Sequence, residues 1–234
     1  VCVGEGENAL LELVERMENG GDLTSVPNLR IPARWSPTGQ AIVNPVAPFP
    51  DLATLPEQDF ELFDLDHIVR VKKGWMGMLT SRGCPYKCTF CSSPQMWTTR
   101  YVVREPEEVA EEIAEYVERY GVRNVNFADL TAITKRQWTL RFCDALEAKA
   151  PGVIWQLPVG TRAEALDAEV LQRLWDTGCR NITYAPEAGG ERMLDIYDKR
   201  VSLDNILNSL GEAKRIGLVT KINIIVGHPE ERWS

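Results

Sequence analysis

Three cysteines within eight residues form the densest group of metal-binding side chains in the sequence: Cys84, Cys88 and Cys91. Their spacing is C-x3-C-x2-C, within the run Arg82-Gly83-Cys84-Pro85-Tyr86-Lys87-Cys88-Thr89-Phe90-Cys91. Thiolate sulfur is a soft ligand that suits iron, so three neighbouring thiolates can hold three irons of a cubane cluster. The fourth iron then has no protein ligand, and a small molecule can bind to it.

A zinc site and a set of unrelated core cysteines are the two alternative interpretations. Structural zinc takes four ligands, with cysteines paired at C-x2-C spacing. No fourth cysteine or histidine lies nearby, since the two histidines of the chain are His67 and His228. The spacing therefore favours iron over zinc.

Strand-like and helix-like runs alternate from residue 75 onwards, and these elements must position the cysteines. The strand-like runs are 75–81, 122–129, 153–160, 181–187 and 219–227. Between them, periodic apolar residues predict helices over 106–120 and from Thr134, Asp167 and Ser202. This alternation predicts an α/β fold with a parallel sheet, and we expect a partial barrel rather than an open doubly wound sheet. The cysteines fall in the loop after the first strand.

The cysteine run is similar to the signature of the radical S-adenosylmethionine (SAM) superfamily, C-x3-C-x-aromatic-C, with Phe90 as the aromatic residue. The resemblance implies a 4Fe–4S cluster whose open iron chelates the amino and carboxylate groups of SAM. It also implies reductive cleavage of SAM and hydrogen abstraction from an unactivated C–H bond. The electron would come from a donor such as flavodoxin or ferredoxin. The implied fold is a partial (β/α)6 TIM-like barrel with the cluster loop after its first strand.

The ends of the later strands carry residues that match the SAM-binding positions of this superfamily. In barrels the site forms at the carboxyl ends of the strands. The resemblance implies that Asp129 contacts the SAM amine, although Phe127-Ala128-Asp129 replaces the usual Gly-Gly-Glu. Arg162 suits the SAM carboxylate through a bidentate guanidinium. By the same resemblance Glu187 corresponds to the ribose position, and the adenine-side motif is matched by Gly227 and Pro229.

The first 74 residues have a different character. Residues 1–21 predict a strand end, a Gly4-Glu5-Gly6-Glu7 loop and a helix that Asn8 caps, with one apolar face made by Leu10, Leu11, Val14 and Met17. Residues 22–74 hold seven of the 14 prolines, a density that blocks long helices and central strands. We expect a small hairpin there, over 29–34 and 40–44, followed by an extended connector.

This front segment resembles the cobalamin-binding radical SAM proteins, in which a flavodoxin-like cobalamin-binding domain precedes the barrel. The resemblance implies three parts: a C-terminal remnant of that domain over 1–21, a hairpin and Pro-rich connector over 22–74, and a radical SAM barrel, incomplete at its C-terminus, over 75–234. Gly4, Glu5 and Gly6 are then candidate cobalamin contacts, because open α/β sheets bind ligands at the carboxyl ends of strands. We also expect the strand over 1–3 to be an unpaired edge.

Composition narrows the classes of partner. The chain has 234 residues, 44% apolar and 26% charged, with a net charge of −8, which is typical of a soluble globular protein and lacks the overall basic field of a nucleic-acid-binding protein. The longest apolar stretch, residues 222–226, is too short to span a bilayer. Six cysteines in a chain of this length indicate a reducing, cytoplasmic setting rather than a disulfide scaffold.

Three classes of function remain. The predicted one is a cobalamin-dependent radical SAM enzyme that methylates an unactivated carbon, or cyclises or rearranges a small-molecule or lipid-like substrate. The second is a cobalamin-independent, methylthiotransferase-like enzyme, which would need further cluster cysteines near the N-terminus, where only Cys2 is present. The third is a non-catalytic metal-binding module, which the matched strand ends argue against.

Overall fold

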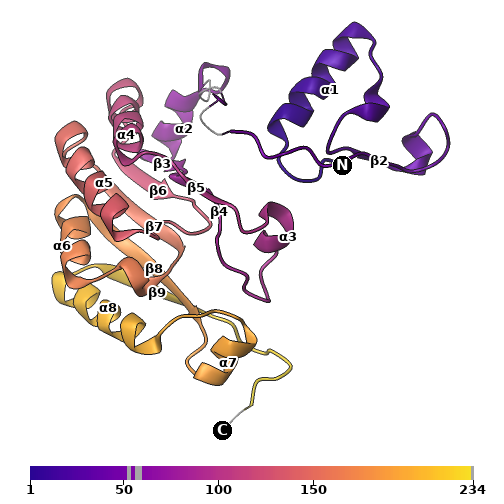
Figure 1. Ribbon diagram of the computed structural model, residues 1–234. Helices are drawn as coiled ribbons and strands as arrows, with labels where there is room; N and C mark the ends of the chain where they lie inside the picture. The colour runs from indigo at the N-terminus through magenta and orange to yellow at the C-terminus, as the bar shows by residue number, and fades with distance from the viewer. Residues whose placement is uncertain (52–53, 56–59, 233–234) are drawn as a thin grey trace. The chain divides into compact units, whose positions relative to one another are not determined.

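Five parallel strands form the main sheet, in the order β3-β6-β7-β8-β9 (Figure 1). They are β3 (Trp75–Met78), β6 (Asn124–Phe127), β7 (Ile154–Thr161), β8 (Cys179–Glu187) and β9 (Val219–Ile224). The computed structural model describes residues 1–51, 54–55 and 60–232. Two units are distinguished in it, one of residues 1–59 and 95–97 and one of residues 60–94 and 98–234. The predicted parallel α/β sheet is confirmed and belongs to the second unit.

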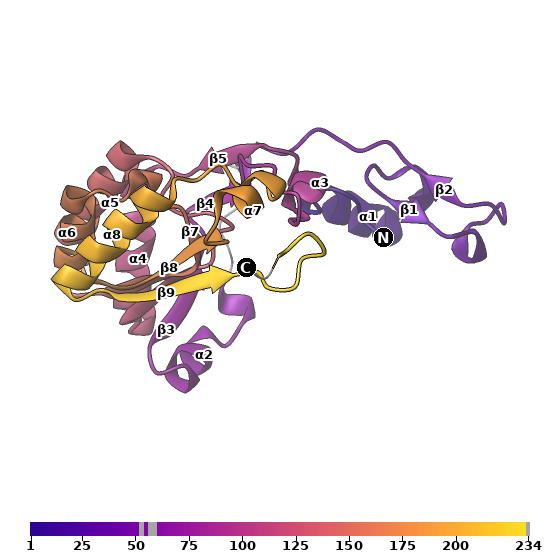
Figure 2. The same ribbon diagram turned by 90° about the horizontal axis from the view of Figure 1, so that it is seen from below.

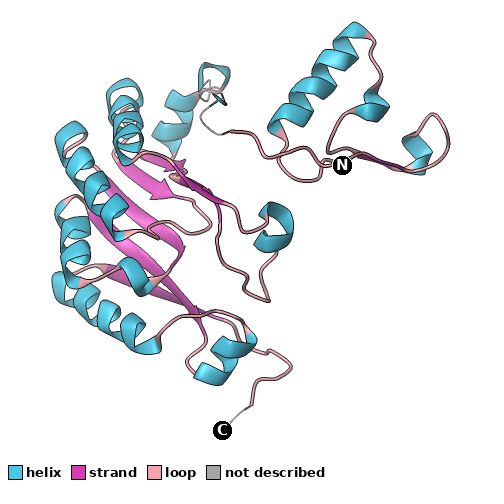
Figure 3. Cartoon of the chain, in the orientation of Figure 1, coloured by secondary structure: helices cyan, strands magenta, loops and turns pink. Residues whose placement is uncertain are grey.

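Four helices that connect these strands cover a single face of the sheet, as Figures 2 and 3 show. They are α4 (Pro106–Tyr120), α5 (Arg136–Lys149), α6 (Ala168–Asp176) and α8 (Leu203–Ile216). Helices were predicted to start near Asp167 and at Ser202, and the structure shows that these residues cap α6 and α8. The Asp167 carboxylate accepts a hydrogen bond from the Val170 N–H, and the Ser202 hydroxyl accepts one from the Asn205 N–H. Helices on one face are typical of a partial barrel, whereas a doubly wound sheet carries helices on both.

The predicted start of α5 is wrong. The helix begins at Arg136, and no side chain caps its first turn. The Thr134 hydroxyl instead donates to the Tyr101 hydroxyl at 3.1 Å. A contact distant in sequence has therefore taken the hydroxyl of the residue at which the helix was predicted to start.

Strand alternation gives the sheet one buried apolar face. Val125, Phe127, Trp155 and Leu157 are 0–1% exposed and pack under the helices. The ring centroid of Phe142 on α5 lies 5.3 Å from that of Trp155. The residues between them, such as Asn126 and Gln156, are paired across β6 and β7 on the opposite face. The core therefore lies between sheet and helices, while the other face carries polar side chains together with exposed apolar ones such as Ile154 and Val219.

Several short elements were not predicted. The expected strand over 75–81 ends at Met78, and the chain turns into an antiparallel ribbon of β4 (Ser81–Gly83) and β5 (Tyr101–Val103). The segment predicted as connector contains α2 (Leu65–Val71), capped by the Asp64 carboxylate. Two further short helices are α3 (Ser93–Trp97) and α7 (Glu191–Ile196). No helix within the described residues is long and apolar enough to cross a membrane.

The first unit contains the predicted helix and hairpin. Helix α1 (Glu7–Asn19) begins after Gly6 rather than at Asn8, and the hairpin pairs β1 (Arg30–Ile31) with β2 (Ile42–Val43). The prediction that the strand over 1–3 is unpaired was wrong on one side. The Arg30 N–H donates to the Val1 carbonyl at 2.8 Å, and the Val3 N–H donates to the Asn28 carbonyl at 2.9 Å. The hairpin segment thus provides backbone hydrogen-bond partners for Val1 and Val3.

Candidate functional site

The cysteine loop begins where the β4–β5 ribbon ends. Gly83, immediately before Cys84, has a φ of +84°, and a Cβ built on it would overlap the carbonyl oxygen of Arg100. Only glycine combines this backbone angle with so close an approach. At the other end of the loop, the Thr89 N–H and hydroxyl donate to the carbonyls of Tyr197 and Ile196, each at 3.0 Å. The loop is therefore fixed at both ends.

The three thiols differ in exposure. Cys84 and Cys88 are half-buried and Cys91 is exposed, and all three are free thiols. Burial raises the pKa of the Cys84 and Cys88 thiols, while the charges of Lys199 and Arg162 act to lower the pKa of Cys88. Within the described residues no three His, Cys, Asp or Glu side chains converge as a metal site. The donor set nevertheless fits a 4Fe–4S cluster, because three free thiols share one loop beside two cations that favour thiolates.

Arg162 lies against the cysteine loop, as its predicted role requires. Its guanidinium carbon is 3.7 Å from the centroid of the Tyr86 ring, and the residue is 7% exposed. Nη2 donates to the Glu164 carboxylate at 2.8 Å and to the Arg200 carbonyl at 2.6 Å. Nη1 is buried without a hydrogen-bond partner in the described part of the chain. A buried donor without an acceptor is unfavourable, and an anionic ligand such as the SAM carboxylate would satisfy it.

Glu187 forms an ion pair that the sequence did not reveal. Its Oε1 lies 3.2 Å from the Nζ of Lys199, and the two side chains are 13% and 8% exposed. Lys199 Nζ also lies 5.8 Å from the centroid of the Phe90 ring. Nothing in the local motif marks Lys199, which follows α7 rather than a strand. The structure therefore brings Glu187 and Phe90 together through a lysine that sequence reasoning missed.

Asp129 is buried, and its carboxylate already has protein partners. It accepts hydrogen bonds from the Thr80 N–H at 3.0 Å, from the Thr80 hydroxyl at 2.9 Å and from the Ser81 hydroxyl. The residue is 1% exposed. These contacts join the end of β6 to the junction between β3 and β4. The predicted SAM-amine contact stays a prediction, and the structure adds a second role in holding the start of the cysteine loop.

The turn after β9 approaches the same loop through aromatic side chains. The Tyr197 ring packs edge-on against Phe90 and His228, with centroids 5.4 Å and 5.3 Å away. Gly227 has a φ of +90°, and its N–H donates to the Glu231 carboxylate at 2.6 Å. Gly227 and Pro229 are exposed. Tyr197 thus brings the predicted adenine-side turn close to the aromatic residue of the cysteine motif.

The candidate cobalamin contacts lie in the first unit. Gly4 has a φ of +86°, Glu5 is 8% exposed, and the Glu5 carbonyl accepts a hydrogen bond from the Asn28 amide at 2.9 Å. Gly6 is the N-cap of α1. The loop over 4–6 is therefore an ordered turn held by the hairpin, and its predicted ligand stays a prediction.

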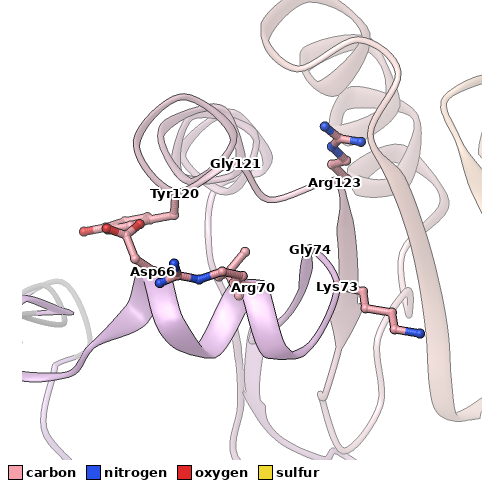
Figure 4. Close-up of a pocket in the computed structure, with 8 residues that line it drawn as sticks. Asp66, Arg70, Lys73, Gly74, Tyr120, Gly121 and Arg123 are labelled. Carbon is pink, nitrogen blue, oxygen red and sulfur yellow. The ribbon is translucent and has the colours of Figure 1, made fainter.

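A cavity lies at the other end of the sheet (Figure 4). Its volume is about 580 Å³, and it is lined by Asp66, Val69, Arg70, Lys73, Gly74, Tyr120, Gly121 and Arg123. These residues come from α2, the end of α4 and the segments before β3 and β6, so they mark the amino ends of the strands. Arg70 is drawn beside Asp66, whereas Lys73 and Arg123 point elsewhere. Barrel chemistry takes place at the carboxyl ends, so we assign this cavity no part in it.

A family model described as the radical SAM superfamily matches residues 78–234. The chain belongs to the radical SAM superfamily. The match begins at the end of β3 and includes the cysteine loop and every strand end described above. The predicted family is therefore confirmed, together with the type of fold.

Two curated relatives align with nearly all of this chain and are themselves much longer proteins. One, named uncharacterized methyltransferase PH0819, from Pyrococcus horikoshii, is 25% identical over 99% of this chain and 49% of its own length. Another is the anaerobic magnesium-protoporphyrin IX monomethyl ester cyclase of Rubrivivax gelatinosus, 25% identical over 97% of this chain and 41% of its own. The radical SAM chain thus spans about half the length of the curated relatives it matches.

Among solved structures, the cobalamin-dependent S-adenosylmethionine radical enzyme OxsB with aqua-cobalamin bound has a TM-score of 0.77 to this chain. The identity is 19%, and the alignment covers 96% of this chain and 33% of OxsB. The likeness shows that the radical SAM fold of the two proteins is shared.

Proposed function

We propose that this chain is the cluster- and SAM-binding part of a cobalamin-dependent radical SAM enzyme that methylates an unactivated carbon or cyclises its substrate. The observation that carries the proposal is Arg162, whose guanidinium stacks on Tyr86 within the cysteine loop and whose buried Nη1 has no hydrogen-bond partner among the described residues. The three thiols can hold the cluster whose open iron would chelate the amino-acid end of SAM. The adjacent guanidinium can bind the carboxylate at that same end. The names of the methyltransferase and cyclase relatives support the reaction class.

Each residue has a defined task in this proposal. Cys84, Cys88 and Cys91 hold three irons, and the bound cluster supplies the electron that cleaves SAM reductively. Arg162 binds the SAM carboxylate, and Glu187 accepts a hydrogen bond from a ribose hydroxyl. Gly227 and Pro229 line the adenine side, with Phe90 beside them. Asp129 holds the strand end from which the loop departs and is the candidate contact of the SAM amine.

The cobalamin assignment depends on the front of the chain. Residues 1–21 would be the end of a cobalamin-binding domain, with Gly4, Glu5 and Gly6 facing the cofactor. Alignment of OxsB over 96% of this chain supports that assignment. The substrate would be a small or lipid-like molecule, the electron donor a flavodoxin or ferredoxin, and the location cytoplasmic.

Iron binding tests the proposal directly. Protein reconstituted without oxygen should hold about four irons per chain. Alanine at Cys84, Cys88 or Cys91 should abolish this iron, whereas alanine at the fully buried Cys143 or Cys179 should leave it. Retention of iron in Cys88→Ala together with its loss in Cys143→Ala would refute the cluster assignment. Retention of added cobalamin by the protein, measured by its absorbance after desalting, tests the second part.

A further inference from the structure

Lys199 is a buried cation that the superfamily match and the sequence motifs leave without a role. Its side chain is 8% exposed, and Nζ lies 3.2 Å from Oε1 of Glu187. Among the described residues, Arg162 and Lys199 are the two buried cations. Removing a charged group from water is costly, so a buried lysine indicates a local requirement for positive charge.

The backbone around Lys199 is held by the site itself. Tyr197, two residues earlier, accepts the hydrogen bond from the Thr89 N–H of the cysteine loop. Arg200, the next residue, accepts the hydrogen bond from Arg162 Nη2. Asp198 and Arg200 have φ angles of +47° and +49°. Non-glycine residues adopt such angles only where surrounding contacts enforce them, as at functional sites.

We propose that Lys199 is a positioning residue whose ammonium orients Glu187 toward SAM and whose charge makes the cluster bound by the neighbouring loop easier to reduce. The inference rests on the proposed function. The position of Lys199 fits this role, because its ammonium pairs with Glu187 and lies 5.8 Å from the centroid of the Phe90 ring. Lys199 also lies two residues after Tyr197, whose carbonyl accepts the hydrogen bond from the Thr89 N–H.

The Lys199 charge also acts on the cluster electrostatically. Three thiolates would bring three negative charges to the loop, and Glu187 adds another. Arg162 offsets part of this charge but is itself paired with Glu164. Reduction adds one more electron to the cluster, and net charge near a cluster is one determinant of its potential. Because charges interact more strongly in a poorly solvated site, loss of the Lys199 charge should disfavour reduction.

The test compares Lys199→Met with Lys199→Arg and with Lys214→Met, a control at an exposed lysine in the last turn of α8. Each anaerobically reconstituted protein is titrated electrochemically while the reduced cluster is followed by electron paramagnetic resonance. SAM affinity is measured separately by calorimetry. Lys199→Met should have a more negative midpoint potential and about tenfold weaker SAM binding, the size of one lost hydrogen bond to a charged group. Lys199→Arg should restore the potential, and Lys214→Met should match the wild type.

A matched pair covers the case in which Lys199→Met fails to fold because Glu187 is left buried without its partner. Glu187→Gln is compared with Glu187→Gln/Lys199→Met, in which neither charge remains. The double variant should still have the more negative potential, but the two should bind SAM equally, because Lys199 acts on SAM through Glu187. Equal midpoint potentials in this pair would overturn the inference. So would a Lys199→Met protein that holds full iron with unchanged midpoint potential and SAM affinity. Either result would leave the proposed function standing. A wild-type protein that holds no iron would overturn the proposed function, and this inference with it.

Discussion

Asp129→Ala tests whether a carboxylate at the end of β6 holds the cysteine loop. In the folded protein the carboxylate accepts hydrogen bonds from the Thr80 N–H, the Thr80 hydroxyl and the Ser81 hydroxyl. A hydrogen bond to a charged group contributes about 1.5–3 kcal/mol. The two hydroxyls can turn to other acceptors, but the Thr80 N–H cannot. We therefore expect the free energy of unfolding to fall by about 3–5 kcal/mol, less than the sum of three such bonds.

The effect should extend to the metal site. Thr80 and Ser81 lead through β4 into Gly83 and Cys84, so release of Thr80 loosens the start of the loop. Iron per chain should fall in Asp129→Ala, whereas Asp129→Asn, which keeps one acceptor oxygen, should lose less of both iron and stability. Urea unfolding of the apoprotein and iron analysis after reconstitution measure the two effects. Asp144→Ala is the control, since that carboxylate is 71% exposed in its pair with Arg173 and should change stability by about 1 kcal/mol or less.

A different result would identify Asp129 as a direct ligand of SAM. In that case Asp129→Ala would keep its unfolding free energy and its iron, and would lose only SAM affinity. That combination would refute the reasoning from the hydrogen bonds. Loss of stability with unchanged SAM affinity in the fraction that still holds iron would support it.

Three other measurements test the site and its surroundings. Arg162→Ala should weaken SAM binding by about 1.5–3 kcal/mol in calorimetry without loss of iron. Arg162→Lys should restore little of the lost affinity, because an ammonium lacks the forked geometry of a guanidinium. Unchanged affinity in both variants would remove Arg162 from the site. Gly83→Ala should lower the free energy of unfolding in urea by more than about 4 kcal/mol and prevent iron binding. Gly121→Ala is the control, because Gly121 has a φ of +65° with open space around it, and it should cost only about 1–2 kcal/mol. Similar values for the two variants would contradict the steric argument. Burial raises the pKa of Cys143 to about 11, so the contribution of this thiol to stability is present below its unfolded-state pKa near 9 and is lost as the pH rises toward 11. Cys143→Ala should therefore lose less stability than the wild type between these pH values. Parallel profiles of unfolding free energy against pH would show that the thiol does not ionise differently on folding.

Elements with local signals were predictable. Helix α4 has the predicted bounds because Pro106 and Gly121 mark its two ends, and α6 and α8 begin directly after Asp167 and Ser202, where helices were predicted to start. The parallel order of the sheet follows from strand–helix alternation. The break in the expected strand over 75–81 had no local signal. There the Thr80 N–H donates to Asp129, 49 residues away, and the ladder ends with the bond from the Ala128 N–H to the Met78 carbonyl.

The site divides in the same way. The cysteines are recognisable from their spacing in the sequence. Arg162 and Glu187 are predictable because they follow or end strands whose carboxyl ends a barrel brings together. Lys199 has neither signal, because it reaches Glu187 from the segment after α7, and its position depends on the left-handed backbone of its two neighbours. An Asp-Lys-Arg sequence on a surface turn would look the same in one dimension. Only the packed structure distinguishes a solvated lysine from a buried one.

Several contacts that fix the cysteine loop come from residues distant in the sequence. Asp129 holds its approach, Arg162 packs on Tyr86 within it, and the carbonyls of Ile196 and Tyr197 bind Thr89 near its end. These partners lie after β6, after β7, and on and after α7, so they take their places only when most of the barrel has folded. The loop's own sequence supplies the sulfur ligands but not their arrangement. Iron loading should therefore follow folding of the barrel rather than direct it, in contrast to small zinc domains, whose folding the metal itself drives.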